Sequence, residues 1–145
     1  MIIDFLDTIA SIKKLYAISL EPICKQYNLT RMELDILLFL ANNPQYDSAK
    51  DIIERRKLTK SHVSTSIKSL AKKNYLKPTY LPNNKKTVHL KLLNTTNEII
   101  EAGQLAQKRF FEIILKDLTK NEKQIIINCF SKILKNTHHA LYEED

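Results

Sequence analysis

Hydrophobic residues recur every three or four positions along most of the chain, which is the spacing of one buried helix face. The pattern covers residues 4–27 and begins again after Thr30, after Ser48 and after Thr59. All three are good N-cap residues, because their hydroxyl groups accept a hydrogen bond from a first-turn amide. Glu33 follows Thr30 at the spacing of a capping box. The first half of the chain therefore predicts four helices.

The helical pattern stops at Asn74, which is a plausible left-handed cap. Residues 87–92 alternate polar and apolar side chains, as a half-buried strand does, and residues 76–81 are also expected to be extended. Proline and asparagine provide turn chemistry between them, at residues 82–85. Helical spacing then returns up to the end of the chain. The predicted fold is therefore mainly α with a small β-hairpin.

A link of about three residues joins the third and fourth predicted helices, which is the helix-turn-helix arrangement. In this motif the second helix enters the major groove of DNA, and a basic hairpin directly after it forms a wing that reaches the adjacent minor groove or its phosphates. An edge hairpin that its lysines keep soluble is the alternative interpretation of this segment. We therefore expect a winged helix-turn-helix domain over residues 30–93.

The segments on either side, residues 1–29 and 94–145, carry more hydrophobic surface than a small domain can cover. An exposed stripe of this kind favours packing against a second copy. We expect both segments to be dimerisation helices of a homodimer. A two-fold dimer presents its recognition helices about 34 to 36 Å apart, so the expected operator is an inverted repeat.

The composition excludes several classes of protein. Phosphate-binding loops and dinucleotide fingerprints need two or three glycines, and Gly103 is the only glycine. No paired carboxylates, triad spacing or metal signature occur, so we expect no enzyme, no catalytic residue, no metal site and no cofactor. No apolar run reaches the roughly 18 to 20 residues of a membrane span, and the N-terminus has no signal-peptide pattern, so we expect a cytoplasmic protein with no membrane partner.

The charges are distributed unevenly. The chain has 23 Lys+Arg and 16 Asp+Glu, a formal net charge of +7. Residues 55–97 contain eleven basic residues and no acidic one, whereas the rest of the chain has 12 basic and 16 acidic residues. Such a segment indicates a surface that binds a polyanion. A membrane surface is a poorer fit, because the predicted fourth helix has no large aromatic residues opposite its basic face.

The predicted fourth helix buries Val63, Ile67 and Leu70 and leaves a face of short hydroxyl groups and lysines. Short polar side chains let a helix lie close to base edges, and flanking lysines reach phosphates. A solvated face is the alternative interpretation. The predicted contacts to bases and phosphates in the major groove are Ser61, His62, Ser64, Thr65 and Lys68. The predicted contacts to the DNA backbone are Lys60, Lys72, Lys85 and Lys86.

The order of elements over essentially the whole chain resembles the MarR family of bacterial winged helix-turn-helix regulators, with the staphylococcal SarA-like branch as a related alternative. The motifs that carry the resemblance are Leu29-Thr30-x-x-Glu33-Leu34-x-x-Leu37, Leu58-Thr59-Lys60-Ser61-x-Val63-Ser64-x-x-Ile67-x-x-Leu70 and Asn74-Tyr75-Leu76. The wing departs from the family pattern. Where the family has Asp-x-Arg, this chain has Asn84, Lys85 and Lys86, so the expected wing contacts are weaker or mainly to phosphate.

The resemblance implies a sequence-specific DNA-binding transcriptional regulator, more often a repressor, whose terminal helices form the dimer. It also implies a possible small-molecule effector site between these helices and the DNA-binding lobe. Cys24 is expected to be a buried structural cysteine, and the resemblance adds a redox-sensing thiol as the alternative. A winged helix that binds protein without specific DNA binding is the alternative function.

Overall fold

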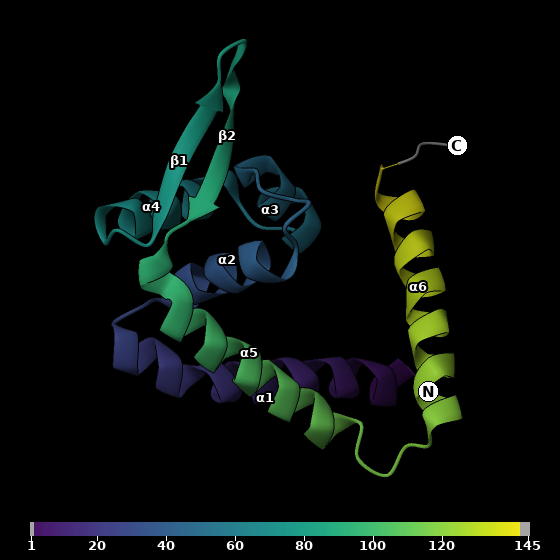
Figure 1. The fold of residues 1–145 in the computed structure, drawn as a ribbon. Coiled ribbons are helices and arrows are strands. Elements are labelled where there is room, and N and C mark those ends of the chain that lie inside the picture. Colours follow the sequence, from purple (N-terminus) through teal and green to yellow (C-terminus); the bar gives the residue numbers. More distant parts are fainter. Residues whose placement is uncertain (1, 143–145) are drawn as a thin grey trace. The chain divides into compact units, whose positions relative to one another are not determined.

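The computed structural model describes residues 2–142. They are mostly helical with one two-stranded antiparallel hairpin, which confirms the predicted fold class (Figure 1). The elements in chain order are α1 (Ile2–Tyr27), α2 (Arg31–Asn42), α3 (Ala49–Arg56), α4 (Lys60–Lys72), β1 (Leu76–Leu81), β2 (Asn84–Leu92), the 3-10 turn η1 (Asn94–Thr96), α5 (Asn97–Ile114) and α6 (Lys120–Tyr142).

Side chains cap α2 and α3 as the sequence predicts. Thr30 Oγ1 accepts the Glu33 amide at 3.1 Å, and Glu33 Oε1 accepts the Thr30 amide at 3.3 Å. Ser48 and Asp51 form the same reciprocal pair at the start of α3. The prediction for Thr59 is wrong in one respect. Thr59 is the N-cap of α4, but its side chain makes no capping hydrogen bond.

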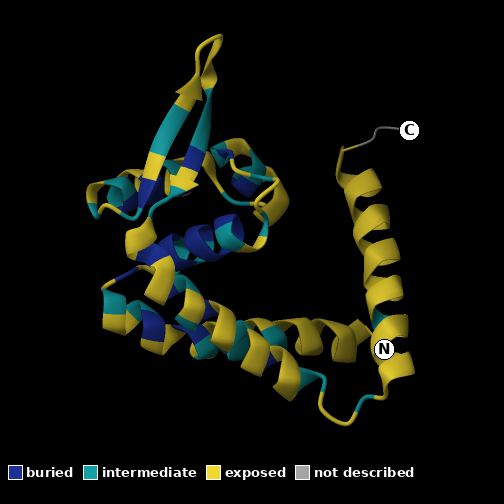
Figure 2. Cartoon of the chain, in the orientation of Figure 1, coloured by how far each residue is buried: buried dark blue, intermediate teal, exposed yellow. Residues whose placement is uncertain are grey.

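Helix α2 lies at the centre of the hydrophobic core, and most of its length is buried (Figure 2). It packs against α4, which buries the predicted Val63, Ile67 and Leu70. Helix α5 comes close to α2 at Gly103, where a Cβ atom would lie 2.5 Å from Leu38 Cδ2. A larger residue than this glycine would therefore require the buried Leu38 side chain to shift.

The hairpin is tighter at its tip than the sequence predicts. Leu81 pairs with Asn84, so the loop is only Pro82 and Asn83, and β2 begins at Asn84 instead of near Thr87. The base of the hairpin is attached to the segment before α3, because the Leu90 amide donates to the Asp47 carbonyl at 2.8 Å. This attachment fixes the wing to the helix-turn-helix.

The chain forms two compact units, residues 1–110 and residues 111–145, described here up to residue 142. In the second unit, Thr119 and Glu122 form a capping box at the start of α6. Helix α6 has no buried residue. Residues 143–145, the end of the predicted dimerisation segment, lie outside the described residues. Between Ile2 and Tyr142, no helix combines the length and hydropathy that a membrane span requires.

Candidate nucleic-acid interface

The polar face of α4 is a continuous exposed stripe. Seven residues of α4 are predicted to contact DNA. Because successive helix residues point about 100° apart, six of the seven fall within about 140° of the helix circumference, and His62 lies about 60° beyond the edge of this stripe. All of them are exposed except Ser64, which is partly buried. The six residues of the stripe are Lys60, Ser61, Ser64, Thr65, Lys68 and Lys72. The structure therefore brings together four of the five residues that the sequence assigned to the major groove, with Lys60 and Lys72, and places His62 outside the stripe.

Thr65 also bonds within its own helix, because its hydroxyl donates to the Ser61 carbonyl at 2.9 Å. This bond orients the side chain and leaves the oxygen lone pairs and the methyl group toward solvent. A hydroxyl in this state is an acceptor for an exocyclic amino group of a base, and its methyl group suits the methyl of thymine.

Four of the eleven basic residues in segment 55–97 have partners inside the protein. The Arg55 guanidinium lies 3.4 Å from the centre of the Tyr46 ring, and Arg56 lies 4.9 Å from that of Phe39. Lys57 donates to the Glu54 carbonyl, and Lys73 pairs with Glu33 at 2.9 Å. The acid-free segment therefore has an acidic partner from elsewhere in the chain, which the local charge count does not show.

The ammonium groups of the remaining lysines of the segment make no hydrogen bond or ion pair with any other residue between Ile2 and Tyr142. All are exposed. Their ammonium groups are therefore available to a polyanion. They are Lys60, Lys68, Lys72, Lys77, Lys85, Lys86 and Lys91.

Lys77 and Lys91 are candidates that the sequence analysis did not select. They lie directly opposite each other on β1 and β2. Like charges at opposite positions of a hairpin are destabilising, and a bound phosphate removes that repulsion. Their place in the acid-free segment could have identified them from the sequence. That they face each other across the hairpin is known only from the strand register.

Asn84 organises the wing tip. Its side-chain oxygen accepts the Lys86 amide at 3.1 Å and the Thr87 amide at 3.3 Å, and its amide group donates to Thr87 Oγ1 at 3.1 Å. The family's aspartate is absent here, but the asparagine oxygen still holds the backbone at Lys86. The position of Lys86 is therefore defined more firmly than the departure from the family motif suggested.

The environment of Cys24 does not favour a reactive thiolate. Burial raises the pKa of Cys24 above its ordinary value of 9.0, although Arg31 opposes this shift, and nearby Asp35 adds to it. Because the thiolate is the species that reacts with oxidants, little of it is present at neutral pH. Cys24 is only partly buried, so the prediction of a buried cysteine is met only in part, and its structural role stays a prediction.

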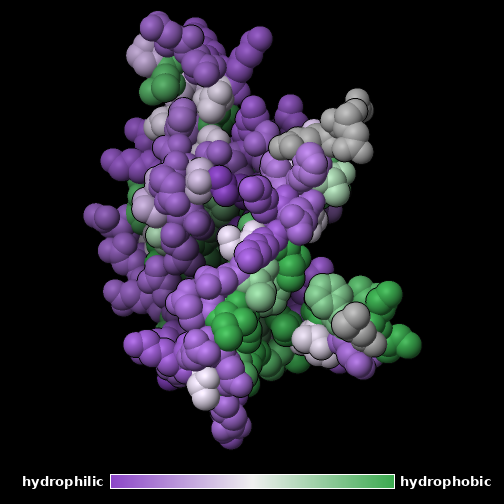
Figure 3. Space-filling model, turned by 90° about the vertical axis from the view of Figure 1, so that its right-hand side faces the viewer, coloured by the Kyte–Doolittle hydropathy of each residue, from purple (hydrophilic) through white to green (hydrophobic). Residues whose placement is uncertain are grey.

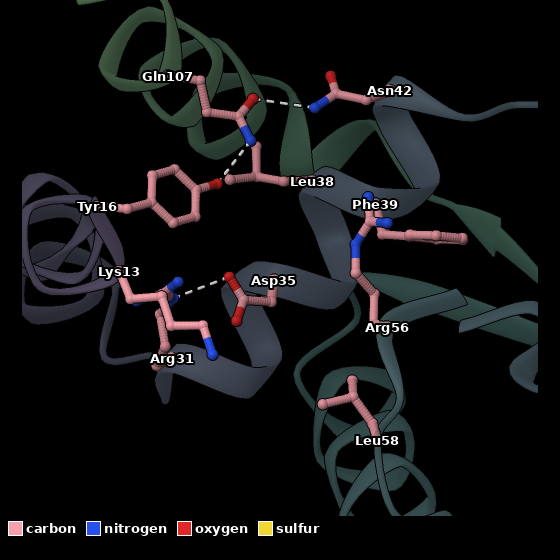
Figure 4. A pocket seen from close by; sticks show the side chains of 10 residues that line it. All are labelled: Lys13, Tyr16, Arg31, Asp35, Leu38, Phe39, Asn42, Arg56, Leu58 and Gln107. Atoms are coloured by element: carbon pink, nitrogen blue, oxygen red, sulfur yellow. Dashed lines mark hydrogen bonds and ion pairs between the residues drawn. The ribbon is translucent and has the colours of Figure 1, made fainter. Parts of the chain in front are cut away.

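A cavity of about 500 Å³ lies between α1, α2, α5 and the end of α3 (Figure 4). Arg31 Nε donates to Asp35 Oδ1 at 2.8 Å, and burial raises the pKa of Asp35 although Arg31 and Arg56 oppose it. Gln107 closes one side by bonding to Asn42 and to the Tyr16 hydroxyl. The lining residues are Lys13, Tyr16, Arg31, Asp35, Leu38, Phe39, Asn42, Arg56, Leu58 and Gln107.

Residues 27–83 match the model of the MarR family. No curated protein matches the sequence. Among solved structures, a putative MarR family transcriptional regulator from Listeria monocytogenes, complexed with 26mer DNA, has a TM-score of 0.82 at 19% identity, with 100% of this chain and 97% of that chain covered.

Two further structures have the same fold. The MarR protein from Peptoclostridium difficile has a TM-score of 0.79 at 19% identity, covering 97% of this chain and 91% of that chain. The MarR of Staphylococcus aureus in complex with salicylate and kanamycin has a TM-score of 0.73 at 21% identity, covering 98% and 93%. Residues 27–83 therefore resemble the MarR family, and the described residues of the chain have the fold of the solved MarR-family regulators.

Proposed function

We propose that the protein is a sequence-specific DNA-binding transcriptional regulator, acting as a homodimer repressor on an inverted-repeat operator. The observation that carries this proposal is the exposed stripe of α4, in which lysines alternate with hydroxyl groups and no carboxylate is present. A lysine and hydroxyl stripe on the second helix of a helix-turn-helix is complementary to base edges flanked by phosphates. The exposed lysines of the wing extend the same positive surface.

The two parts of this surface have different roles. Ser61, Ser64 and Thr65 are short, so they contact base edges, with Lys68 beside them. His62, which lies outside the stripe, contacts the phosphates at its edge. Lys60, Lys72, Lys85 and Lys86 hold the DNA backbone, and Lys77 and Lys91 add to their charge.

Thr65→Ala and Lys86→Ala separate these roles. We expect Thr65→Ala to relax the preference for one or two base pairs by about 1 to 3 kcal/mol, because it removes a base contact. Lys86→Ala should weaken binding to all duplexes by a similar factor, because a phosphate contact carries no sequence information. Selection of bound duplexes from a random pool, followed by titration of each variant, measures both effects. Equal losses on all sequences from both variants would contradict this division.

The homodimer is supported by exposed hydrophobic side chains on three helices. Figure 3 shows such side chains as green areas on the surface. Phe5 and Leu6 on α1, and Phe111 and Ile113 on α5, are each about half exposed. Helix α6 has seven large hydrophobic residues with at least 45% exposure. Monomers rarely expose this much apolar surface, so we assign these helices, within residues 1–29 and 94–145, to the contact with a second copy.

The cavity beside Arg31 is the proposed effector site. It is lined by the cations Lys13, Arg31 and Arg56 and a single carboxylate, Asp35, and the ring of Tyr16 lies on its wall. An aromatic ring with an anionic group fits this lining, because the ring packs on tyrosine and the anion pairs with a cation. The salicylate complex of the Staphylococcus aureus MarR makes salicylate a suitable probe.

Lys13→Gln tests the effector site, with Lys14→Gln as the matched control. We expect salicylate to bind the wild-type protein and to lower its affinity for the selected duplex, and we expect Lys13→Gln to weaken salicylate binding about tenfold because a charged hydrogen bond is lost. Lys14 does not line this cavity, so its variant should bind salicylate as the wild type does. Calorimetric titration measures the affinities. Equal weakening by both variants would place the anion elsewhere.

A further inference from the structure

The carboxylate of Glu33 is buried although it belongs to a helix cap. Its side chain is only 4% exposed. One oxygen, Oε1, completes the capping box with Thr30. This task alone needs no charge, because glutamine serves equally well at this position of a capping box. A buried charge without a partner is costly, so the second oxygen requires its own explanation.

That second oxygen faces the recognition helix α4. Glu33 Oε2 accepts a hydrogen bond from Lys73 Nζ at 2.9 Å and one from Ser69 Oγ at 3.3 Å. Lys73 Nζ also donates to the Asn28 carbonyl at 2.8 Å, in the turn between α1 and α2. Two donors from the end of α4 therefore meet at one carboxylate of α2, and one of them, Lys73, also binds the turn before α2. We call Glu33, Ser69 and Lys73 the clamp.

The clamp residues of α4 alternate with the DNA-facing lysines. Lys68 and Ser69 are neighbours, as are Lys72 and Lys73, and successive residues point about 100° apart. The sequence analysis counted Lys73 among the basic residues of the polyanion-binding segment, and the structure turns it inward. The orientation of Lys68 and Lys72 therefore depends on where Ser69 and Lys73 are held.

The two ends of α4 are fixed differently. At the start, Thr59 makes no side-chain capping bond, whereas at the end the clamp joins α4 to α2. Burial by itself would raise the pKa of Glu33, but the hydrogen bonds from Lys73 and Thr30 outweigh it, and the pKa lies below its ordinary value. Glu33 is therefore charged at neutral pH and binds Lys73 as an ion pair.

We propose that Glu33 is a positioning residue for DNA binding, which holds the C-terminal end of α4 against α2 through Ser69 and Lys73 and so sets the angle of the lysine and hydroxyl stripe. This inference rests on the proposed function, because a stripe that reads no bases needs no fixed angle. It assigns to Lys73 an internal role in place of a phosphate contact.

Glu33→Gln and Lys73→Gln, alone and together, test the clamp, with Glu122→Gln as the matched control. Glu122 has the same capping position in α6, but among residues 2–142 its carboxylate bonds only to Thr119. Two readouts are needed at a temperature where circular dichroism shows every variant folded. The first is amide hydrogen exchange at Asn74 and Tyr75, whose amides bond back to the last turn of α4. The second is the ratio of affinities for the selected duplex and for a random duplex.

Each single variant should speed exchange at these two amides about tenfold and lower the affinity ratio about tenfold, because one charged hydrogen-bond network is broken. The double variant should lose no more than either single one, because both residues act in the same pair. Lys73→Gln should leave the slope of log affinity against log salt unchanged, and Glu122→Gln should change nothing.

Two results would overturn the clamp. One is a decrease of about 1.8 in the salt slope of a Lys73→Gln dimer, which would make Lys73 a phosphate contact. The other is wild-type exchange at Asn74 and Tyr75 in both single variants. If the wild-type protein preferred no duplex over another, the proposed function would fail by itself. Faster exchange at Asn74 and Tyr75 in the single variants would then still show that the clamp fixes the end of α4, and unchanged exchange would refute it.

Discussion

Binding of the wild-type protein to its selected duplex should weaken about 10⁴-fold between 50 and 200 mM salt. The reason is the release of counterions from DNA. If Lys60, Lys72, Lys85 and Lys86 each neutralise one phosphate, a dimer neutralises eight, and log affinity should fall against log salt with a slope of about −7. Fluorescence anisotropy of a labelled duplex at several salt concentrations measures this slope.

Single lysine variants show which side chains cause the slope. Lys72→Gln should make the slope of the dimer shallower by about 1.8, because one phosphate contact is lost per protomer. Lys14→Gln, on α1, should leave it unchanged. A wild-type slope shallower than about −3 would mean few phosphate contacts and would favour the alternative of a winged helix that binds protein.

The double variant Phe130→Asp/Ile133→Asp should weaken dimerisation about 10³-fold and abolish tight binding to the inverted repeat. Both side chains are about half exposed on the apolar side of α6, so the charges should cost the isolated chain little stability. In a dimer that buries this face, four carboxylates would be desolvated without partners. Analytical ultracentrifugation at several protein concentrations gives the dissociation constant, and circular dichroism shows that α6 remains helical.

Ser131→Asp is the matched control for this prediction. It adds one negative charge to the same helix, about 140° from the centre of the apolar stripe. It should leave the dimer intact. If the double variant also remained a dimer of wild-type strength, α6 would not form the interface, and the contact would have to be sought on α1 and α5.

Local patterns predicted the elements well where the deciding interactions are local. The capping box at Thr30 and the N-cap at Ser48 formed as expected, because each joins residues three positions apart in one turn. The inward face of α4 was equally clear, since Val63, Ile67 and Leu70 follow helical spacing. Thr59 has the same capping chemistry, but its hydroxyl group makes no such bond, and nothing in its own sequence neighbourhood indicates this.

Local patterns did not predict which polar and charged side chains would have partners inside the protein. Lys72 and Lys73 are adjacent and identical, yet one is exposed and the other is bound to a carboxylate 40 positions away. Asn84 was considered a loss relative to the family's aspartate, but its side-chain oxygen accepts two backbone amides at the wing tip. Both outcomes depend on which groups the fold brings within about 3 Å, and residue type alone does not determine that.

The sequence by itself determined the helices, the hairpin and the segment of positive charge, because periodicity, turn chemistry and charge are properties of neighbouring residues. Only the tertiary structure decided which lysines have partners inside the protein, where the cavity beside Arg31 lies, and how Glu33 reaches α4. These features join α1, α2, α4 and α5, and a hydrogen bond or a cavity between distant segments exists only after the core has placed their backbones.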